Sequence, residues 1–150
     1  MRFIPAARAT AYLMSGDRAM AEDLAHEAFL RATGRFAHLR EPETFGAYLR
    51  KTVTTVCLNH LRRRKLERTK GAPQMPAPAL MPDVARAQDL WRSLHTLPPR
   101  QRAALVLRYY EDLSERQAAE ILRCSRTAVR SLVAHGLRSL RDRMREDPDG

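Results

Sequence analysis

Apolar side chains recur at spacings of three and four residues along most of the chain, which is the period of amphipathic α-helices. In the N-terminal half, this spacing predicts three helices, over residues 3–15, 17–33 and 44–65. Pro5 restricts the start of the first helix, and we expect that helix to begin late. No stretch alternates apolar and polar residues as a half-buried strand does. The pattern therefore predicts an all-α fold.

Residues suited to helix capping precede the second and third predicted helices. Asp17 follows Gly16, and its carboxylate can accept hydrogen bonds from the first amides of the second helix. Thr44 has the corresponding position before the third helix. We therefore expect these two side chains to mark the helix starts.

A proline-rich stretch over residues 71–82 separates two helical regions and contains no charged residue. It cannot continue a helix, so we interpret it as a linker. Beyond it, apolar residues follow the helical period over residues 83–94 and 99–110. We predict two small helical domains joined by this linker. The predicted bounds are 1–68 for the first domain, 69–83 for the linker and 84–145 for the second domain.

Residues 113–144 have the pattern of two helices joined by a tight turn. Ser114 and Gln117 can form a capping box at the start of the first helix, and Ser125 can cap the second. Arg123 follows the first helix, where glycine is usual because the backbone there is often left-handed. A residue with a side chain costs about 1–2 kcal/mol in that conformation. We expect the turn to be either strained or differently shaped.

The second helix of this pair has an apolar face and a cationic face. The apolar face consists of Val129, Leu132, Val133, Gly136, Leu137 and Leu140. The outward face then carries Arg126, Thr127, Arg130, Ser131 and Arg138. Cationic and hydroxyl side chains near the start of such a helix are typical of a helix-turn-helix that reads the DNA major groove. The alternative is an ordinary helical hairpin with a solvated basic face.

The formal net charge of +10 and the sequence pI of about 10.7 favour a polyanionic partner. We rank nucleic acid first, an anionic membrane surface second and an acidic protein third. No apolar run approaches the roughly 18 residues of a membrane-spanning helix, and the N-terminus lacks the apolar block of a signal peptide. We therefore expect a soluble, cytoplasmic protein without membrane insertion.

The sequence carries no arrangement of residues that indicates catalysis. It has no phosphate-binding glycine loop, no nucleophile elbow and no carboxylate cluster for two metal ions. Cys57 and His60 have a helical spacing, but no second Cys or His pair lies near them in sequence. Cys57 and Cys124 have mostly apolar neighbours and fit small buried residues better than a disulfide. We predict no enzymatic activity, no metal and no cofactor.

Motifs in both halves of the chain match one known family in the same order. The C-terminal motifs are Leu97–Ser114, Cys124–Ser131 and His135–Arg141. The N-terminal motifs are Ser15–Arg18, Ala21–Ala32 and Tyr48–Arg64. Together they resemble the extracytoplasmic-function (ECF) sigma factors of bacterial RNA polymerase, in a SigE-like actinobacterial subgroup. The resemblance depends on both halves occurring in this order with a linker between them.

The resemblance implies four groups of contacts. Core RNA polymerase, at the clamp helices of its largest subunit, would be bound by Glu22, Asp23, His26 and Glu27. The −10 element would be bound and opened by Phe36, His38, Arg50, Lys51, Arg62, Arg63 and Arg64. The −35 element would be read by Arg126, Thr127, Arg130, Ser131 and His135. DNA phosphates would be held by Arg100, Gln101, Arg102 and Arg108.

The resemblance thus implies a sigma factor that binds core RNA polymerase and directs it to promoter DNA for initiation. An anti-sigma factor is a further candidate partner. Two positions depart from the family, because His26 stands where glutamine is common and Thr55 where asparagine is common. Two other functions remain open. One is a dimeric helix-turn-helix regulator acting on a palindrome, and the other is a module that chiefly binds a regulatory protein.

Overall fold

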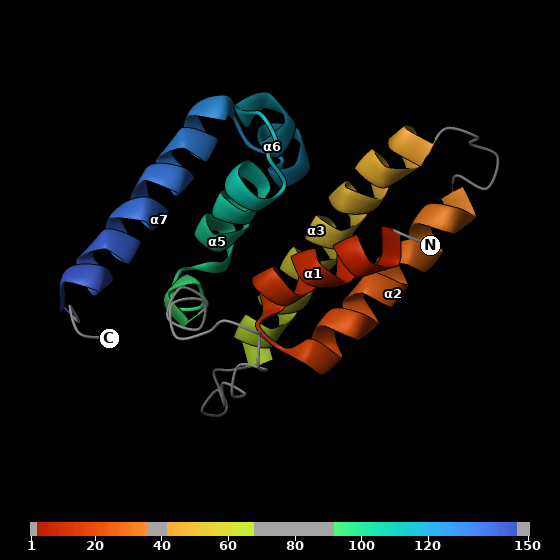
Figure 1. Cartoon of the computed structure of the whole chain (residues 1–150), viewed down its shortest axis with the longest axis horizontal. Coiled ribbons are helices and arrows are strands. Elements are labelled where there is room, and N and C mark those ends of the chain that lie inside the picture. Colours follow the sequence, from red (N-terminus) through yellow and green to blue (C-terminus); the bar gives the residue numbers. More distant parts are fainter. Residues whose placement is uncertain (1–2, 36–41, 68–91, 147–150) are drawn as a thin grey trace. The chain divides into compact units, whose positions relative to one another are not determined.

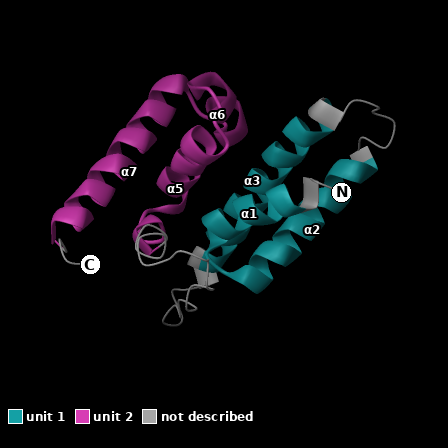
Figure 2. Cartoon of the chain, in the orientation of Figure 1, with its two compact units in different colours: residues 1–76 teal, residues 77–150 magenta. Residues whose placement is uncertain are grey.

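The computed structural model describes residues 3–35, 42–67 and 92–146 (Figure 1). Helices are the only regular elements in these three ranges, so the predicted all-α fold class is confirmed. The chain divides into two compact units, residues 1–76 and 77–150 (Figure 2). The predicted linker and the start of the helix expected after it lie outside the described residues, and their bounds stay predictions.

The described residues of the first unit form three helices: α1 (Phe3–Ser15), α2 (Arg18–Arg35) and α3 (Pro42–Glu67). Each of them packs against the other two. The alanines that α1 and α2 bury allow close approach, because small contact residues shorten the distance between helix axes. The buried apolar core consists of Ala7, Ala11, Met14, Ala21, Leu24, Ala25, Ala28, Ala32, Leu49, Val53, Val56 and Cys57.

The first two helices begin in different ways. α1 starts before Pro5, so the predicted late start is wrong. The proline lies in the first turn, where a missing N–H group leaves no helical hydrogen bond unmade. Asp17 caps α2 as predicted, because its Oδ1 accepts hydrogen bonds from the amides of Ala19 at 3.0 Å and Met20 at 3.2 Å.

The predicted start of α3 is also wrong. This helix begins at Pro42, and Thr44 lies inside its first turn rather than before it. Proline suits the first helical position because its φ angle is already helical. The helix therefore starts at the proline, two residues before the threonine that was expected to cap it.

The second unit contains α5 (Pro99–Leu105), η2 (Val106–Tyr110), α6 (Glu115–Leu122) and α7 (Arg126–Glu146). η2 continues α5 directly, so the helix predicted over residues 99–110 has the expected extent. Its last turn is a π-helix, which the sequence did not indicate. The amide of Glu111 donates to the carbonyl of Val106 at 2.9 Å, a bond across five residues instead of four.

The core of the second unit lies where α7 packs against α5 and α6. Val129 of α7 is fully buried, and Gly136 brings the backbone of α7 close to α5. This packing fixes the angle at which the outer face of α7 is presented. The buried apolar residues are Leu97, Ala103, Ala104, Leu105, Val106, Leu107, Leu113, Ala118, Ala119, Leu122 and Val129.

Candidate nucleic-acid interface

The helix α6 begins with the predicted capping box. The amide of Gln117 donates to Oγ of Ser114 at 3.1 Å, and the amide of Ser114 donates to Oε1 of Gln117 at 2.9 Å. Each side chain therefore satisfies one amide that the helix leaves without a partner. The start of the helix-turn-helix is fixed by these two residues.

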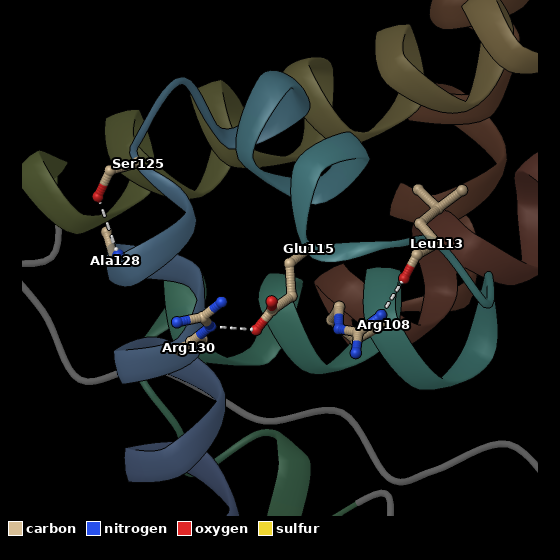
Figure 3. Close-up of polar contacts among 6 residues, drawn as sticks. All are labelled: Arg108, Leu113, Glu115, Ser125, Ala128 and Arg130. Carbon is tan, nitrogen blue, oxygen red and sulfur yellow. Dashed lines mark hydrogen bonds and ion pairs between the residues drawn. The ribbon is translucent and has the colours of Figure 1, made fainter.

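The turn between α6 and α7 has the left-handed backbone that glycine usually provides. Arg123 adopts φ 55° and ψ 50° there, and its amide donates to the carbonyl of Ala119. An L-residue with a side chain costs about 1–2 kcal/mol in this conformation. Of the two expectations for this turn, strain is the one observed. Ser125 then caps α7, because the amide of Ala128 donates to its Oγ at 3.0 Å (Figure 3).

The outer face of α7 brings together the residues predicted to read DNA. All of them are exposed, namely Arg126, Thr127, Arg130, Ser131 and His135. The inner face holds the predicted apolar stripe, in which Val129 and Gly136 are buried and the remaining members are half-buried. The helix therefore presents cationic, hydroxyl and imidazole groups to solvent, while its apolar side chains anchor it to the unit.

One residue of this face is paired with the other helix of the motif. Nε of Arg130 donates to Oε2 of Glu115 at 2.8 Å (Figure 3). This hydrogen bond is the main cause that lowers the pKa of the Glu115 carboxyl and raises the pKa of the Arg130 guanidinium. Glu115 was not predicted as a functional residue, because the pairing joins positions fifteen residues apart on two helices.

The residues predicted to hold phosphates also support the fold. Arg100 is exposed, and its Nη2 donates to the carbonyl of Leu122 at 2.9 Å, at the end of α6. Arg108 is half-buried and donates from Nη1 to the carbonyl of Leu113 (Figure 3). Gln101 is half-buried, and its Oε1 has no hydrogen-bond partner among the described residues. Both arginines brace the helix-turn-helix, and phosphate contact by these three residues stays a prediction.

Arg102 is buried, unlike the other three residues predicted to hold phosphates. Its residue surface is only 6% exposed, which leaves little of it within reach of a phosphate, and its phosphate contact stays a prediction. The helical period turns this residue inward although its neighbour Arg100 faces solvent.

Burial lowers the pKa of His95 to about 4, and the charge of Arg102 contributes as a second cause. The imidazole is therefore neutral at pH 7.

The acidic face of α2 is exposed as predicted, with Glu22, Asp23, His26 and Glu27 all at the surface. Two of its carboxylates have a cation nearby in the same unit. Nε of Arg8 lies 3.6 Å from Oε1 of Glu22, and Nη2 of Arg31 lies 2.7 Å from Oε1 of Glu27. Asp23 is the carboxylate of this face that forms no ion pair with a described residue.

The acidic face is hollowed where α1 meets α2. The hollow has a volume of about 320 Å³ and is lined by Arg8, Glu22, Asp23, Ala25, His26 and Phe29. A protruding partner side chain can enter a depression of this size, which a flat helix surface does not offer. His26, which departs from the family, lines this hollow together with Glu22 and Asp23, two of the other predicted polymerase contacts.

The residues predicted to act on the −10 element are only partly described. Phe36 and His38 lie outside the described residues. Of the predicted residues on α3, Lys51, Arg62 and Arg63 are exposed, and Arg50 and Arg64 are half-buried.

Thr55, the other departure from the family, donates its hydroxyl hydrogen to the carbonyl of Lys51 at 2.9 Å. Its hydroxyl can therefore serve DNA only as an acceptor while this bond is made. An asparagine at the same position would bring amide donors as well. With Thr55, this position of α3 therefore has a hydrogen-bond acceptor for a nucleic acid but no free donor.

The described residues form no membrane-spanning helix, no cluster of metal ligands and no disulfide. Within the described ranges, no helix is both long and apolar enough to cross a membrane. The same ranges contain no group of three His, Cys, Asp or Glu side chains that could hold a metal ion. Cys57 is buried as predicted, whereas Cys124 is only half-buried, and both are free thiols.

Both units match models of one protein family. Residues 1–67 match the model described as Sigma-70 region 2, and residues 87–140 match the model described as Sigma-70, region 4. The fold also resembles the sigma factor RpoE of Bartonella quintana, solved in complex with the anti-sigma factor NepR. That likeness has a TM-score of 0.79 at 23% identity and covers 97% of this chain and 94% of the other. The fold and the family models agree on both units.

Two relatives with similar sequences are also named as RNA polymerase sigma factors. The ECF RNA polymerase sigma factor SigE of Mycolicibacterium smegmatis is 35% identical over 141 residues, which cover 88% of this chain. The present chain spans 54% of that protein's length. The RNA polymerase sigma-E factor of Streptomyces coelicolor is 31% identical over 126 residues, covering 83% of this chain and 71% of the relative. With both regions present in order, the chain belongs to the sigma-70 family, in its group of ECF RNA polymerase sigma factors.

Proposed function

We propose that this chain is a transcription initiation factor that binds core RNA polymerase and directs it to promoters with −10 and −35 elements. It acts in the cytoplasm as a binding subunit, and the chemistry of RNA synthesis belongs to the polymerase. A protein of the anti-sigma kind, such as the one bound to the Bartonella relative, is a candidate regulator that would mask these binding surfaces.

The observation that carries this proposal is the outer face of α7. Five exposed polar side chains lie along the first half of a helix whose start is capped by Ser125. The major groove is about 12 Å wide and admits one helix, so a face of this kind can meet base edges. Arg126 and Arg130 would contact guanine, and the hydroxyl groups of Thr127 and Ser131 would contact either base of a pair.

The first unit supplies the polymerase contact and the contact with the downstream element. The exposed carboxylates of α2 fit a cationic surface, and Asp23 has the charge most available for it. The cations of α3 fit the DNA backbone at the −10 element, where Lys51, Arg62 and Arg63 are exposed. Opposite charges on two helices of one small unit thus serve two different partners.

Hydroxyl-radical footprinting on promoter DNA, with and without core polymerase, tests the proposal. We expect protection only when polymerase is present. The protected DNA should include two separate elements upstream of the start site, the −35 and the −10 element. A footprint with two symmetric half-sites one helical turn apart, made by the chain alone, would instead show a dimeric regulator. Absence of any salt-sensitive binding even with polymerase would favour a module that chiefly binds a regulatory protein.

A further inference from the structure

Glu115 and Arg130 connect the two helices of the helix-turn-helix. Glu115 is the first residue of α6, and Arg130 lies in the second turn of α7 (Figure 3). The hydrogen bond from Nε of Arg130 to Oε2 of Glu115 is 2.8 Å long. The side chain of Glu115 is 26% exposed, whereas that of Arg130 is 60% exposed. The glutamate is therefore the sheltered member of the pair, and the arginine extends into solvent.

The pairing leaves the groups of Arg130 that recognise a base available. A guanidinium has five N–H donors in one plane, and Glu115 occupies the one on Nε. The two Nη groups carry the other four, and these make no hydrogen bond with a described residue. Two Nη groups side by side match O6 and N7 of guanine in the major groove. The bond to Glu115 and a bidentate bond to guanine can therefore exist together.

The pairing also orders Arg130 before DNA arrives. A long arginine side chain loses rotamer freedom when it is held on a base, and this loss weakens binding. The charges of Arg130, Arg108 and Arg126 act on Glu115 in the same direction as the hydrogen bond from Arg130, and each favours the ionised carboxylate. Glu115 is therefore ionised at neutral pH. A carboxylate holds the guanidinium of Arg130 more strongly than a neutral hydrogen-bond acceptor would.

We propose that Glu115 is a positioning residue that sets the base preference of Arg130, holding its Nε so that both Nη groups face one guanine of the upstream promoter element. The inference rests on the proposed function, because it requires α7 to enter the major groove. It also predicts two effects of opposite sign. The negative charge of Glu115 lowers affinity for DNA phosphates in general, while the orientation it gives Arg130 raises preference for one base pair.

Selection from a DNA library with a randomised upstream element tests this role, using the full chain assembled with core RNA polymerase. The variants are Arg130→Ala, Glu115→Gln and the control Glu120→Gln. Glu120 lies on the same helix and forms an ion pair with Arg116 at 3.8 Å, so the control removes an equal charge from α6. Helix content and thermal unfolding of each variant show that the fold is retained.

We expect Arg130→Ala to abolish a guanine preference at one position of the selected sequences. Glu115→Gln should reduce the preference at that same position by about five-fold or more, while affinity for unrelated DNA stays equal or rises. Glu120→Gln should keep the wild-type profile. The inference is overturned if Glu115→Gln keeps or sharpens that preference, since the pair would then be a latch that DNA must break.

The two proposals fail in different ways. If the wild-type complex selects no sequence at all, the proposed function is wrong. If the wild type selects a sequence but Arg130→Ala changes no position of it, Arg130 reads no base and only the role of Glu115 is lost.

Discussion

Gly136 lies so close to Leu105 that a Cβ added to the glycine would meet Cδ1 of Leu105 at 2.9 Å. The leucine is 4% exposed, so it has little room to move away. The absence of a side chain at Gly136 therefore lets α7 pack directly on α5. This contact holds α7 in place from its inner side.

Gly136→Ala is expected to destabilise the second unit. Overpacking a core costs about 1–3 kcal/mol, and the better helix propensity of alanine offsets about 1 kcal/mol of that. We predict a net loss of about 1 kcal/mol in the free energy of unfolding, measured by chemical denaturation. Gly34→Ala is the matched control, because nothing lies within 4 Å of its added Cβ, and it should stabilise α2. Equal effects of the two substitutions would contradict the close packing.

Arg123→Gly is expected to stabilise the helix-turn-helix. Relief of the left-handed strain is worth about 1–2 kcal/mol, and the greater chain entropy of glycine in the unfolded state offsets part of it. We predict a net gain of about 0.5–1 kcal/mol in the free energy of unfolding. The same change at Arg116, which lies inside the right-handed helix α6, should cost about 1 kcal/mol. A loss at both positions would show that Arg123 makes a compensating contact.

The stability of the second unit should depend on pH through His95. Its pKa in the folded state is lowered to about 4 from 6.5, so below pH 6.5 the unfolded chain binds a proton that the folded chain does not. Stability is therefore highest above pH 6.5 and falls as the pH falls toward 4. Because the imidazole is only partly buried, we predict a loss of about 1–2 kcal/mol between pH 7 and 5.

Denaturation midpoints measured across this pH range compare the wild type with His95→Gln. The variant should show a flatter pH dependence, whatever its absolute stability, since it lacks the group that titrates. An unchanged slope in His95→Gln would mean that other groups carry the acid sensitivity.

Asp23→Lys is expected to weaken binding to core polymerase by at least about ten-fold, because it reverses a charge of the acidic face that no described cation pairs with. Affinity measured with purified core enzyme, by fluorescence anisotropy of the labelled chain, reports the loss. Glu146→Lys, an exposed change of equal charge at the end of α7, is the control and should retain affinity. If Asp23→Lys also binds as the wild type does, the docking face lies elsewhere.

The parts of the site that sequence reasoning predicted well depend on short-range chemistry. Ser114, Gln117 and Ser125 act on amides within three residues of themselves, so their roles can be inferred from spacing. The outward face of α7 follows from the helical period in the same way. Arg123 was recognised as an exception for the same reason, since the turn requires a left-handed residue whatever surrounds it.

The parts that it missed depend on packing between elements. Arg102 appeared to belong to a basic surface, but the second unit closes over it, and no local pattern signals that burial. The pairing of Glu115 with Arg130 depends on how two helices cross. The π-turn at Val106 arises in an apolar run whose spacing suits an α-helix equally well. The burial of Arg102 and the Glu115–Arg130 pair depend on distances between elements, whereas the π-turn is a local change of hydrogen bonding that the residue pattern does not distinguish from an α-helix.

Run-off transcription with purified core RNA polymerase, on templates carrying a sequence selected by the wild-type complex, tests the central claim most directly. We predict transcripts from one defined start site only when the chain is added, with loss of the signal when either the upstream or the downstream element is scrambled. Transcription that does not depend on the chain, or does not respond to either element, would contradict its role as a sigma factor.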